Sequence, residues 1–191
     1  MEQYLKNKRL LKENNVYSDD MEHDACGVGV IASTEGKKSR QVVEYGIEAL
    51  KAVWHRGAVD ADGKTGDGAG IHVEIPKDFF IEKIEVTGHE YENSEIGVGM
   101  IFLPRNDYGS QEACKTIVES ELTKNNFSIY GWRQVPVNPK VLGEKALMTM
   151  PEIIQVLFRS NDESLLNKEL ERKIYETRRK IENEAIKQSL R

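Results

Sequence analysis

The sequence predicts an α+β protein, in which short strands and amphipathic helices follow one another along the chain. Proline ends the three apolar runs that we expect to be strands, which are residues 71–75, 97–103 and 127–135. Apolar residues recur at steps of three and four in residues 39–54 and 110–125, as in helices that are buried on one side. The length of 191 residues suffices for one domain or one and a half.

The composition limits the compartment and the partners. The net charge of −5 argues against nucleic acid, because phosphate binding needs a basic face. No apolar run approaches the ~20 residues that span a bilayer, and residues 1–25 lack the apolar core of a secretory signal. We therefore expect no membrane partner. Two cysteines do not make a disulfide framework, so we also expect a reducing, cytoplasmic setting.

In chain order, the first segment is a polar leader over residues 1–25, which is either a flexible terminus or a removable prosegment. Alternation of glycine with valine and isoleucine predicts a short strand over residues 26–33. We then expect a helix over 39–54, a loop over 58–70, strands over 71–75 and 97–103, a helix over 110–125 with Ser110 as N-cap and Cys114 in its buried stripe, strands over 127–135 and 152–158, and a long charged helix from Ser164.

Cys26 directly follows the leader. If the chain is cut before it, this residue carries both a thiol and a free α-amino group, so a nucleophile and its general base share one position. If the chain is not cut, Cys26 is an ordinary small residue of a buried strand, which the local residues favour. Two weaker alternatives are a Cys–His pair and half a zinc site in His23-x-x-Cys26, and we expect no metal because the second half of such a site is missing. The four histidines are His23, His55, His72 and His89.

Glycine and aspartate dominate residues 58–70. The glycines of the run Gly66-Asp67-Gly68-Ala69-Gly70 precede a predicted strand, whereas phosphate-binding loops lead into a helix, and Asp67 would repel a pyrophosphate. We therefore expect these glycines to provide positive φ angles and close backbone packing.

Arg56 lies just before this loop. It could form a structural ion-pair cluster with the acidic side chains that follow it, or that cluster could wall a pocket around Cys26. The acidic residues are Asp60, Asp62 and Asp67.

Several segments, taken in order, resemble the start of the large subunit in the glutamate synthase family. The most specific are the run from His55-Arg-Gly to Gly66-Asp-Gly and the run Gly131-Trp-Arg-Gln-Val-Pro. The matching segments are Cys26-Gly-Val-Gly-Val-Ile-Ala, Trp54 to Ile71, Val98-Gly-Met-Ile-Phe-Leu-Pro, Gly131-Trp-Arg-Gln-Val-Pro-Val and Leu142-Gly143.

The resemblance implies that residues 26–191 are a class II glutamine amidotransferase domain, a member of the N-terminal nucleophile hydrolases. It implies stacked antiparallel sheets between helical layers (αββα) and removal of residues 1–25 before Cys26. Cys26 would then be the catalytic nucleophile in the hydrolysis of L-glutamine, with its α-amino group as general base. Arg56, Asp67 and Gly68 would support the pocket.

The resemblance also implies that the released ammonia serves glutamate synthesis from 2-oxoglutarate, an oxidoreductase reaction of nitrogen assimilation. FMN and an iron–sulfur cluster would belong to the remainder of the synthase, and none to this segment. The remainder of the synthase chain and a small reductase subunit would be partners.

Two alternatives to a glutamate synthase function remain open. Another class II amidotransferase is disfavoured by the run Gly131-Trp-Arg-Gln-Val-Pro, and a non-catalytic binding or assembly module would keep its leader. No Asn-Gly dipeptide, which supplies the oxyanion donors of the family, occurs in the sequence. We therefore expect a truncated N-terminal fragment with an incomplete αββα fold and little glutaminase activity of its own.

Overall fold

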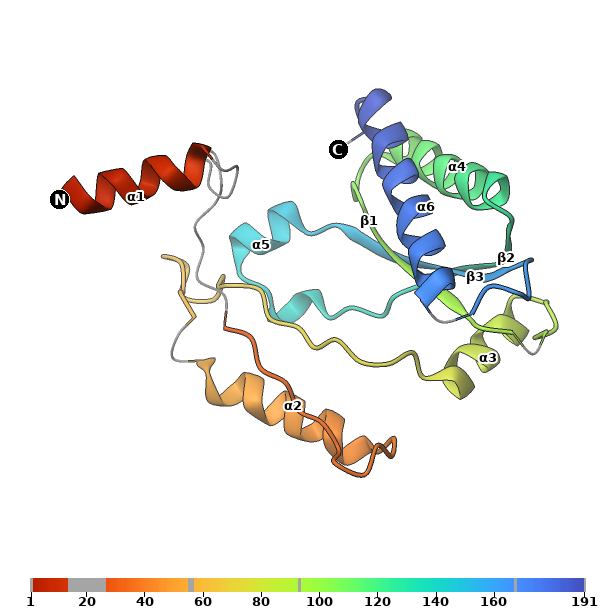
Figure 1. Ribbon diagram of the computed structural model, residues 1–191, viewed down its shortest axis with the longest axis horizontal. Coiled ribbons are helices and arrows are strands. Elements are labelled where there is room, and N and C mark those ends of the chain that lie inside the picture. Colours follow the sequence, from red (N-terminus) through yellow and green to blue (C-terminus); the bar gives the residue numbers. More distant parts are fainter. Residues whose placement is uncertain (1, 14–26, 55–56, 93, 167, 191) are drawn as a thin grey trace. The chain divides into compact units, whose positions relative to one another are not determined.

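The structure, a computed structural model, describes residues 2–13, 27–54, 57–92, 94–166 and 168–190. The chain divides into two compact units, Met1–Arg56 and Gly57–Arg191. Figure 1 shows helices together with one sheet, which confirms the predicted α+β class. The predicted boundary between leader and domain, at Ala25 and Cys26, lies outside the described residues and stays a prediction.

The described residues of the first unit form two helices, α1 (Glu2–Glu13) and α2 (Arg40–Ala52). The predicted helix over residues 39–54 is confirmed as α2, with the Ser39 hydroxyl accepting a hydrogen bond from the Val42 N–H (3.4 Å). The expected polar leader contains α1, whose leucines and lysines are strong helix formers.

The strand predicted over residues 26–33 is wrong for its described part, residues 27–33, which has no regular secondary structure. A strand exists through hydrogen bonds to a neighbouring strand, and no described segment pairs with these residues. Cys26 itself lies outside the described residues.

The second unit is built on a three-stranded antiparallel sheet with the order β1-β3-β2. Its strands are β1 (Gly97–Leu103), β2 (Phe127–Gln134) and β3 (Glu152–Ser160). All three were predicted, with ends that differ by two residues or fewer. The middle of the central strand β3, residues 154–158, is buried, because strands flank both of its edges and apolar cores cover both of its faces.

Helices α4 (Tyr108–Lys124) and α6 (Lys168–Lys187) lie together over one face of the sheet (Figure 1). The core on this face consists of Val118, Leu122, Phe127, Val156, Phe158 and Leu170. The helix predicted over residues 110–125 starts earlier than expected, because Asp107 rather than Ser110 is its N-cap. Cys114, expected in the core, is only half-buried.

Helix α6 begins at Lys168, four residues after the predicted start. The side chain of Asp162 accepts hydrogen bonds from the Ser164 N–H (3.1 Å) and the Ser164 hydroxyl (2.6 Å). These bonds form a turn before the helix, as Asp and Ser commonly do.

No helix within the described ranges is both long and apolar enough to cross a bilayer.

Helix α3 (Lys77–Val86) covers the opposite face, where alternate residues of the strands point. Its core consists of Phe80, Ile84, Ile96, Tyr130 and Leu157. Towards the other end of β1 this face is open, and Met100 and Phe102 are 49% and 64% exposed.

The strand predicted over residues 71–75 is wrong, because this segment has no regular secondary structure. Ile71 and Val73 alternate with polar residues as in a half-buried strand, yet no strand among the described residues pairs with them. The remaining elements are a 3₁₀ turn, η2 (Pro139–Val141), and the short helix α5 (Glu144–Thr149).

Candidate functional site

Of the four residues expected at the site, Asp67 and Gly68 are described, whereas Cys26 and Arg56 lie outside the described residues. His72 and His89 are described, and His89 Nδ1 lies 3.1 Å from the Thr87 hydroxyl. Neither the Cys–His alternative nor the pocket around Cys26 is therefore tested. The described part of the candidate site is the loop rich in glycine and aspartate.

Residues 58–67 of this loop form a small hairpin, which we call the 58–67 hairpin. Val59 and Gly66 form an antiparallel bridge, and the Asp60 N–H donates to the Thr65 carbonyl (2.7 Å). Asp67 closes the base, because its Oδ2 accepts from the Ala58 N–H (2.8 Å) and its own N–H donates to the Ala58 carbonyl (3.3 Å). The Asp67 carboxylate thus determines how the chain leaves the hairpin towards Gly68.

The glycines in this loop have different roles. Gly63 has a φ of +69°, which side chains rarely tolerate, and its N–H donates to the Asp60 carbonyl (2.9 Å). A Cβ at Gly66 would lie 2.9 Å from the Ala58 carbonyl oxygen. Of the expected roles, close packing is confirmed at Gly66, whereas Gly68 and Gly70 have nothing within 4 Å of a Cβ position. Positive φ, which was expected at Gly66, Gly68 and Gly70, is wrong for all three, because the tip of the turn lies at Gly63 instead.

Asp62 organises the tip of the hairpin. Its carboxylate accepts hydrogen bonds from the Thr65 hydroxyl (2.5 Å), the Thr65 N–H (2.7 Å) and the Lys64 N–H (2.9 Å). These bonds, that of the Thr65 hydroxyl first, hold the pKa of Asp62 well below its ordinary value of 3.8. The group is therefore a carboxylate at neutral pH, and as an acceptor it gives the turn a single geometry.

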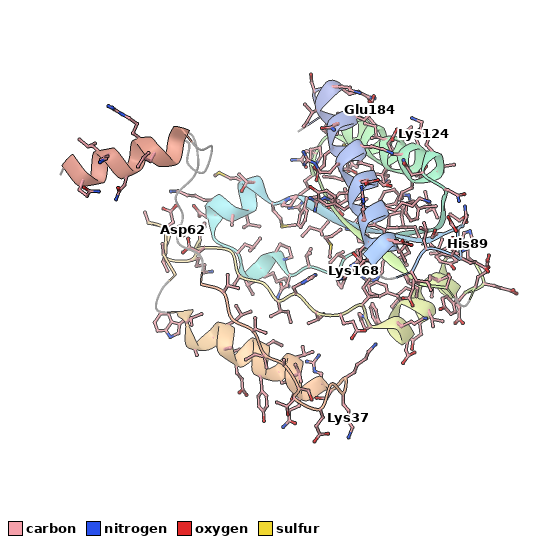
Figure 2. All side chains as sticks on the ribbon, in the orientation of Figure 1. Lys37, Asp62, His89, Lys124, Lys168 and Glu184 are labelled. Atoms are coloured by element: carbon pink, nitrogen blue, oxygen red, sulfur yellow. The ribbon has the colours of Figure 1, made fainter. Side chains whose placement is uncertain are left out.

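The 58–67 hairpin packs on the start of α5, far along the chain. Lys145 Nζ lies 2.7 Å from each carboxylate oxygen of Asp60, and the Ala146 N–H donates to the Thr65 hydroxyl (3.4 Å). Figure 2 labels Asp62 at this hairpin. No local pattern indicated this contact, because residues 60 and 145 are 85 positions apart.

The run Gly131-Trp-Arg-Gln belongs to β2 and supports the sheet. Gly131 follows a register shift in β2, and a Cβ there would lie 2.9 Å from Thr87 Cγ2. Trp132 Nε1 donates to Glu119 of α4 (2.7 Å), while the Arg133 guanidinium donates to the Gln155 side chain (2.6 Å). These contacts have structural roles.

No group of three or more His, Cys, Asp or Glu among the described residues is placed to hold a metal ion. The described part includes a single cysteine, Cys114, which belongs to α4 and is half-buried. The described residues therefore do not fit an iron–sulfur cluster, which needs several thiolates.

Comparison with known proteins gives consistent matches. The family profile described as "Glutamine amidotransferases class-II" matches residues 26–191. The chain is 53% identical over 176 residues to "Glutamate synthase [NADPH] large chain" of Azospirillum brasilense, covering 92% of this chain and 12% of that protein. It is 38% identical over 175 residues to "Ferredoxin-dependent glutamate synthase" of Pyropia yezoensis, covering 91% and 11%.

A third relative, "Glutamate synthase [NADPH] large chain" of Bacillus subtilis, is 33% identical over 179 residues, covering 94% of this chain and 12% of that protein. The chain therefore spans only 11–12% of the length of these relatives. Because the profile extends from residue 26 to residue 191, it covers most of the chain. The chain thus belongs to the class II glutamine amidotransferase family.

Proposed function

We propose that this chain hydrolyses glutamine as part of a glutamate synthase, with Cys26 as the nucleophile. The observation that carries the proposal is that the family match begins at residue 26. This is the cysteine that the sequence singles out as a nucleophile with its own base once the leader is removed. The three relatives are named as glutamate synthases, which supports a role for this chain as part of such an enzyme.

The chemistry follows from cleavage between Ala25 and Cys26. The freed α-amino group has an ordinary pKa of about 8, so part of it is neutral at pH 7 and accepts the thiol proton. The thiolate attacks the carboxamide carbon of glutamine, and the ammonium group returns the proton as ammonia leaves. Water then hydrolyses the thioester, which releases glutamate and regenerates the thiol.

The 58–67 hairpin supports the glutamine pocket in this proposal, together with Arg56 and Gly68. The Asp67 carboxylate is engaged by the Ala58 N–H, so its part is to shape the loop. Arg56 immediately precedes the hairpin and carries a forked set of donors suited to carboxylates and carbonyls.

The fold in this proposal includes a second antiparallel sheet on the open face of the first. Met100 and Phe102 are exposed there, although aromatic and sulfur-containing side chains of this size are usually buried. The segment 71–75 has the alternation of a strand, and no strand of the described sheet pairs with it. Both features are explained if a second sheet packs on this face.

The whole protein, in this proposal, uses the ammonia for glutamate synthesis from 2-oxoglutarate in the reducing cytoplasm. FMN and an iron–sulfur cluster would be bound by the remainder of the synthase chain, which would act with a small reductase subunit. They would carry the electrons of the reduction from an external donor, a nicotinamide or a ferredoxin, whereas glutamine hydrolysis at Cys26 needs neither.

The test combines mass analysis with two cysteine variants of the full-length protein. We expect a mature N-terminus at Cys26, and a loss of ammonia release from glutamine on the order of 10³-fold or more in Cys26→Ser. Cys114→Ser is the matched control and should retain activity, because Cys114 belongs to α4. An active protein that retains residues 1–25, or a Cys26→Ser variant with full ammonia release, would overturn the proposal.

The same proteins, assayed also for glutamate formation from 2-oxoglutarate, separate the alternatives. Another class II amidotransferase would release ammonia from glutamine without forming glutamate from 2-oxoglutarate. A non-catalytic module would keep its leader and release no ammonia. Either result contradicts the proposed synthase role.

A further inference from the structure

We propose that the segment Gly143–Ala146, where α5 begins, is a positioning platform for the 58–67 hairpin. This inference rests on the proposed function, in which the hairpin supports the glutamine pocket. The residues of this platform act through the hairpin and are positioning residues. Three contacts carry the inference, and each joins segments about 80 positions apart in the chain.

The first contact is a close approach at Gly143. This residue is buried, and a Cβ added to it would lie 2.5 Å from the Thr65 backbone nitrogen and still closer to the Thr65 hydroxyl and the Asp62 carboxylate. A backbone atom cannot swing aside as a flexible side chain can. Any other residue at position 143 must therefore push the hairpin away from α5.

The second contact completes the N-terminus of α5. Its N-cap is Gly143, which has no side chain to accept hydrogen bonds from the first turn. The Thr65 hydroxyl accepts from the Ala146 N–H (3.4 Å) and donates to Asp62 (2.5 Å). The hairpin thus supplies the cap that a Ser or Asp at position 143 would otherwise supply.

This arrangement couples the two segments. With six residues, α5 is too short to be stable as an isolated helix, so its first turn depends on the Thr65 hydroxyl. The Lys145 N–H also contributes to lowering the pKa of Asp62, and so favours the charged carboxylate that orders the hairpin tip. Each segment therefore stabilises the conformation that the other requires.

The third contact, between Lys145 and Asp60, sets the orientation of the hairpin. The ammonium lies 2.7 Å from both carboxylate oxygens, while the side chains remain 60% and 36% exposed. An exposed ion pair of this kind contributes little to the free energy of unfolding. Its expected effect is therefore on the orientation of the hairpin relative to α5. Tilting of the hairpin would move Asp67, and with it the chain that leads to Gly68.

The test uses Gly143→Ala and Lys145→Met in the full-length protein. Hydrogen exchange at the N–H groups of Asp60, Gly63 and Asp67 should accelerate about tenfold or more in Gly143→Ala and less in Lys145→Met. The KM for glutamine should rise several-fold, and it should rise more in the variant that displaces the hairpin more. The value of kcat should change less than the KM. Lys140→Met is the matched control, because this exposed lysine of η2 lies outside the platform, and it should change neither quantity.

Reversal of the charge pair provides a rescue. Asp60→Lys and Lys145→Asp should each raise the exchange rate and the KM, and the double variant should restore both towards the original values. Unchanged exchange in Gly143→Ala, or no recovery in the double variant, would overturn the platform. Faster exchange with an unchanged KM would also overturn it, because the contact would then be purely structural.

Failure of the platform and failure of the proposed function give different results. Hydrogen exchange reports hairpin packing whether or not the protein hydrolyses glutamine, whereas Cys26→Ser tests the hydrolysis alone. If Gly143→Ala does not fold, Lys145→Met and the charge reversal decide the question, since their side chains are partly exposed.

Discussion

Burial differs sharply between neighbouring residues of α3, and stability should follow it. Ile84 is fully buried against the sheet, whereas Val86 on the same helix is 83% exposed. We expect Ile84→Ala to lower the free energy of unfolding by about 2–5 kcal/mol, because it leaves a cavity. Val86→Ala should change it by about 0.5 kcal/mol or less. Urea unfolding of both variants measures the difference, and equal effects would contradict the described packing of α3.

The half-buried Cys114 differs chemically from a terminal cysteine. Burial, and to a smaller extent the negative charge of Asp107, raises the pKa of its thiol above the ordinary 9.0. The sequence contains two cysteines, so the Cys26→Ser variant leaves Cys114 as the cysteine whose alkylation is measured. Its alkylation rate should therefore have a pH midpoint above 9.0, which should fall to the ordinary value in denaturant. A midpoint below 9.0 in the folded protein would contradict this environment.

At the scale of elements, the N-terminus of α4 should be sensitive to acid. The Ser110 hydroxyl and N–H donate to the Asp107 carboxylate and hold its pKa below the ordinary 3.8. A lowered pKa in the folded state means that the carboxylate stabilises the fold above pH 3.8, and that this contribution is lost as the pH falls through the lowered value.

The corresponding variant is Ser110→Ala, which removes the hydroxyl donor and keeps the N–H. We expect the pKa of Asp107, measured by NMR titration, to rise towards 3.8, and the stability of the variant to fall off at a higher pH than that of the original protein. Asp107→Asn should remove this part of the acid dependence. An unchanged Asp107 pKa in Ser110→Ala would show that the hydroxyl is not its main partner.

Elements with strong local signals were predictable. The apolar stripe within residues 39–54 indicated α2, and the apolar runs that end before Pro104 and Pro136 indicated β1 and β2. Helices α3 and α5 were missed because they are short, and α5 depends on a cap from Thr65. Residues 27–33 and 71–75 have a strand's alternation, but pairing requires a partner strand that a local pattern does not contain.

At the scale of the whole molecule, the open face of the sheet distinguishes two arrangements. Phe102 is 64% exposed on β1, and a second sheet on this face would bury it. If the proposed stacking holds, Phe102→Asp in the full-length protein should lower the free energy of unfolding by about 2 kcal/mol or more, because a carboxylate would be buried without a partner. Tyr108→Asp, at an exposed aromatic residue of α4, is the matched control with an expected change of about 0.5 kcal/mol or less. An equally mild effect of Phe102→Asp would contradict the stacking.

The candidate site was predictable in its parts and not in its assembly. The loop, the close packing at Gly66 and a structural role for the aspartates followed from composition, whereas the positive φ at Gly63 was not predicted. The expected partner of Asp60, Arg56, lies outside the described residues, so that pairing stays a prediction, whereas nothing in the sequence indicated the described contact of Asp60 with Lys145. A sequence can show that an acidic group needs a partner, but it does not show which distant cation approaches it.

The sequence by itself determined the α+β class, the three strands, the main helices and, through the resemblance around Cys26, the family that the comparisons confirm. Each of these depends on residues close together in the chain or on motifs of fixed spacing. Only the tertiary structure decided that the 58–67 hairpin caps α5, that Gly143 must lack a side chain, and that one face of the sheet is covered by α4 and α6. Such contacts join segments distant in sequence, and they form only when hydrophobic burial brings those segments together.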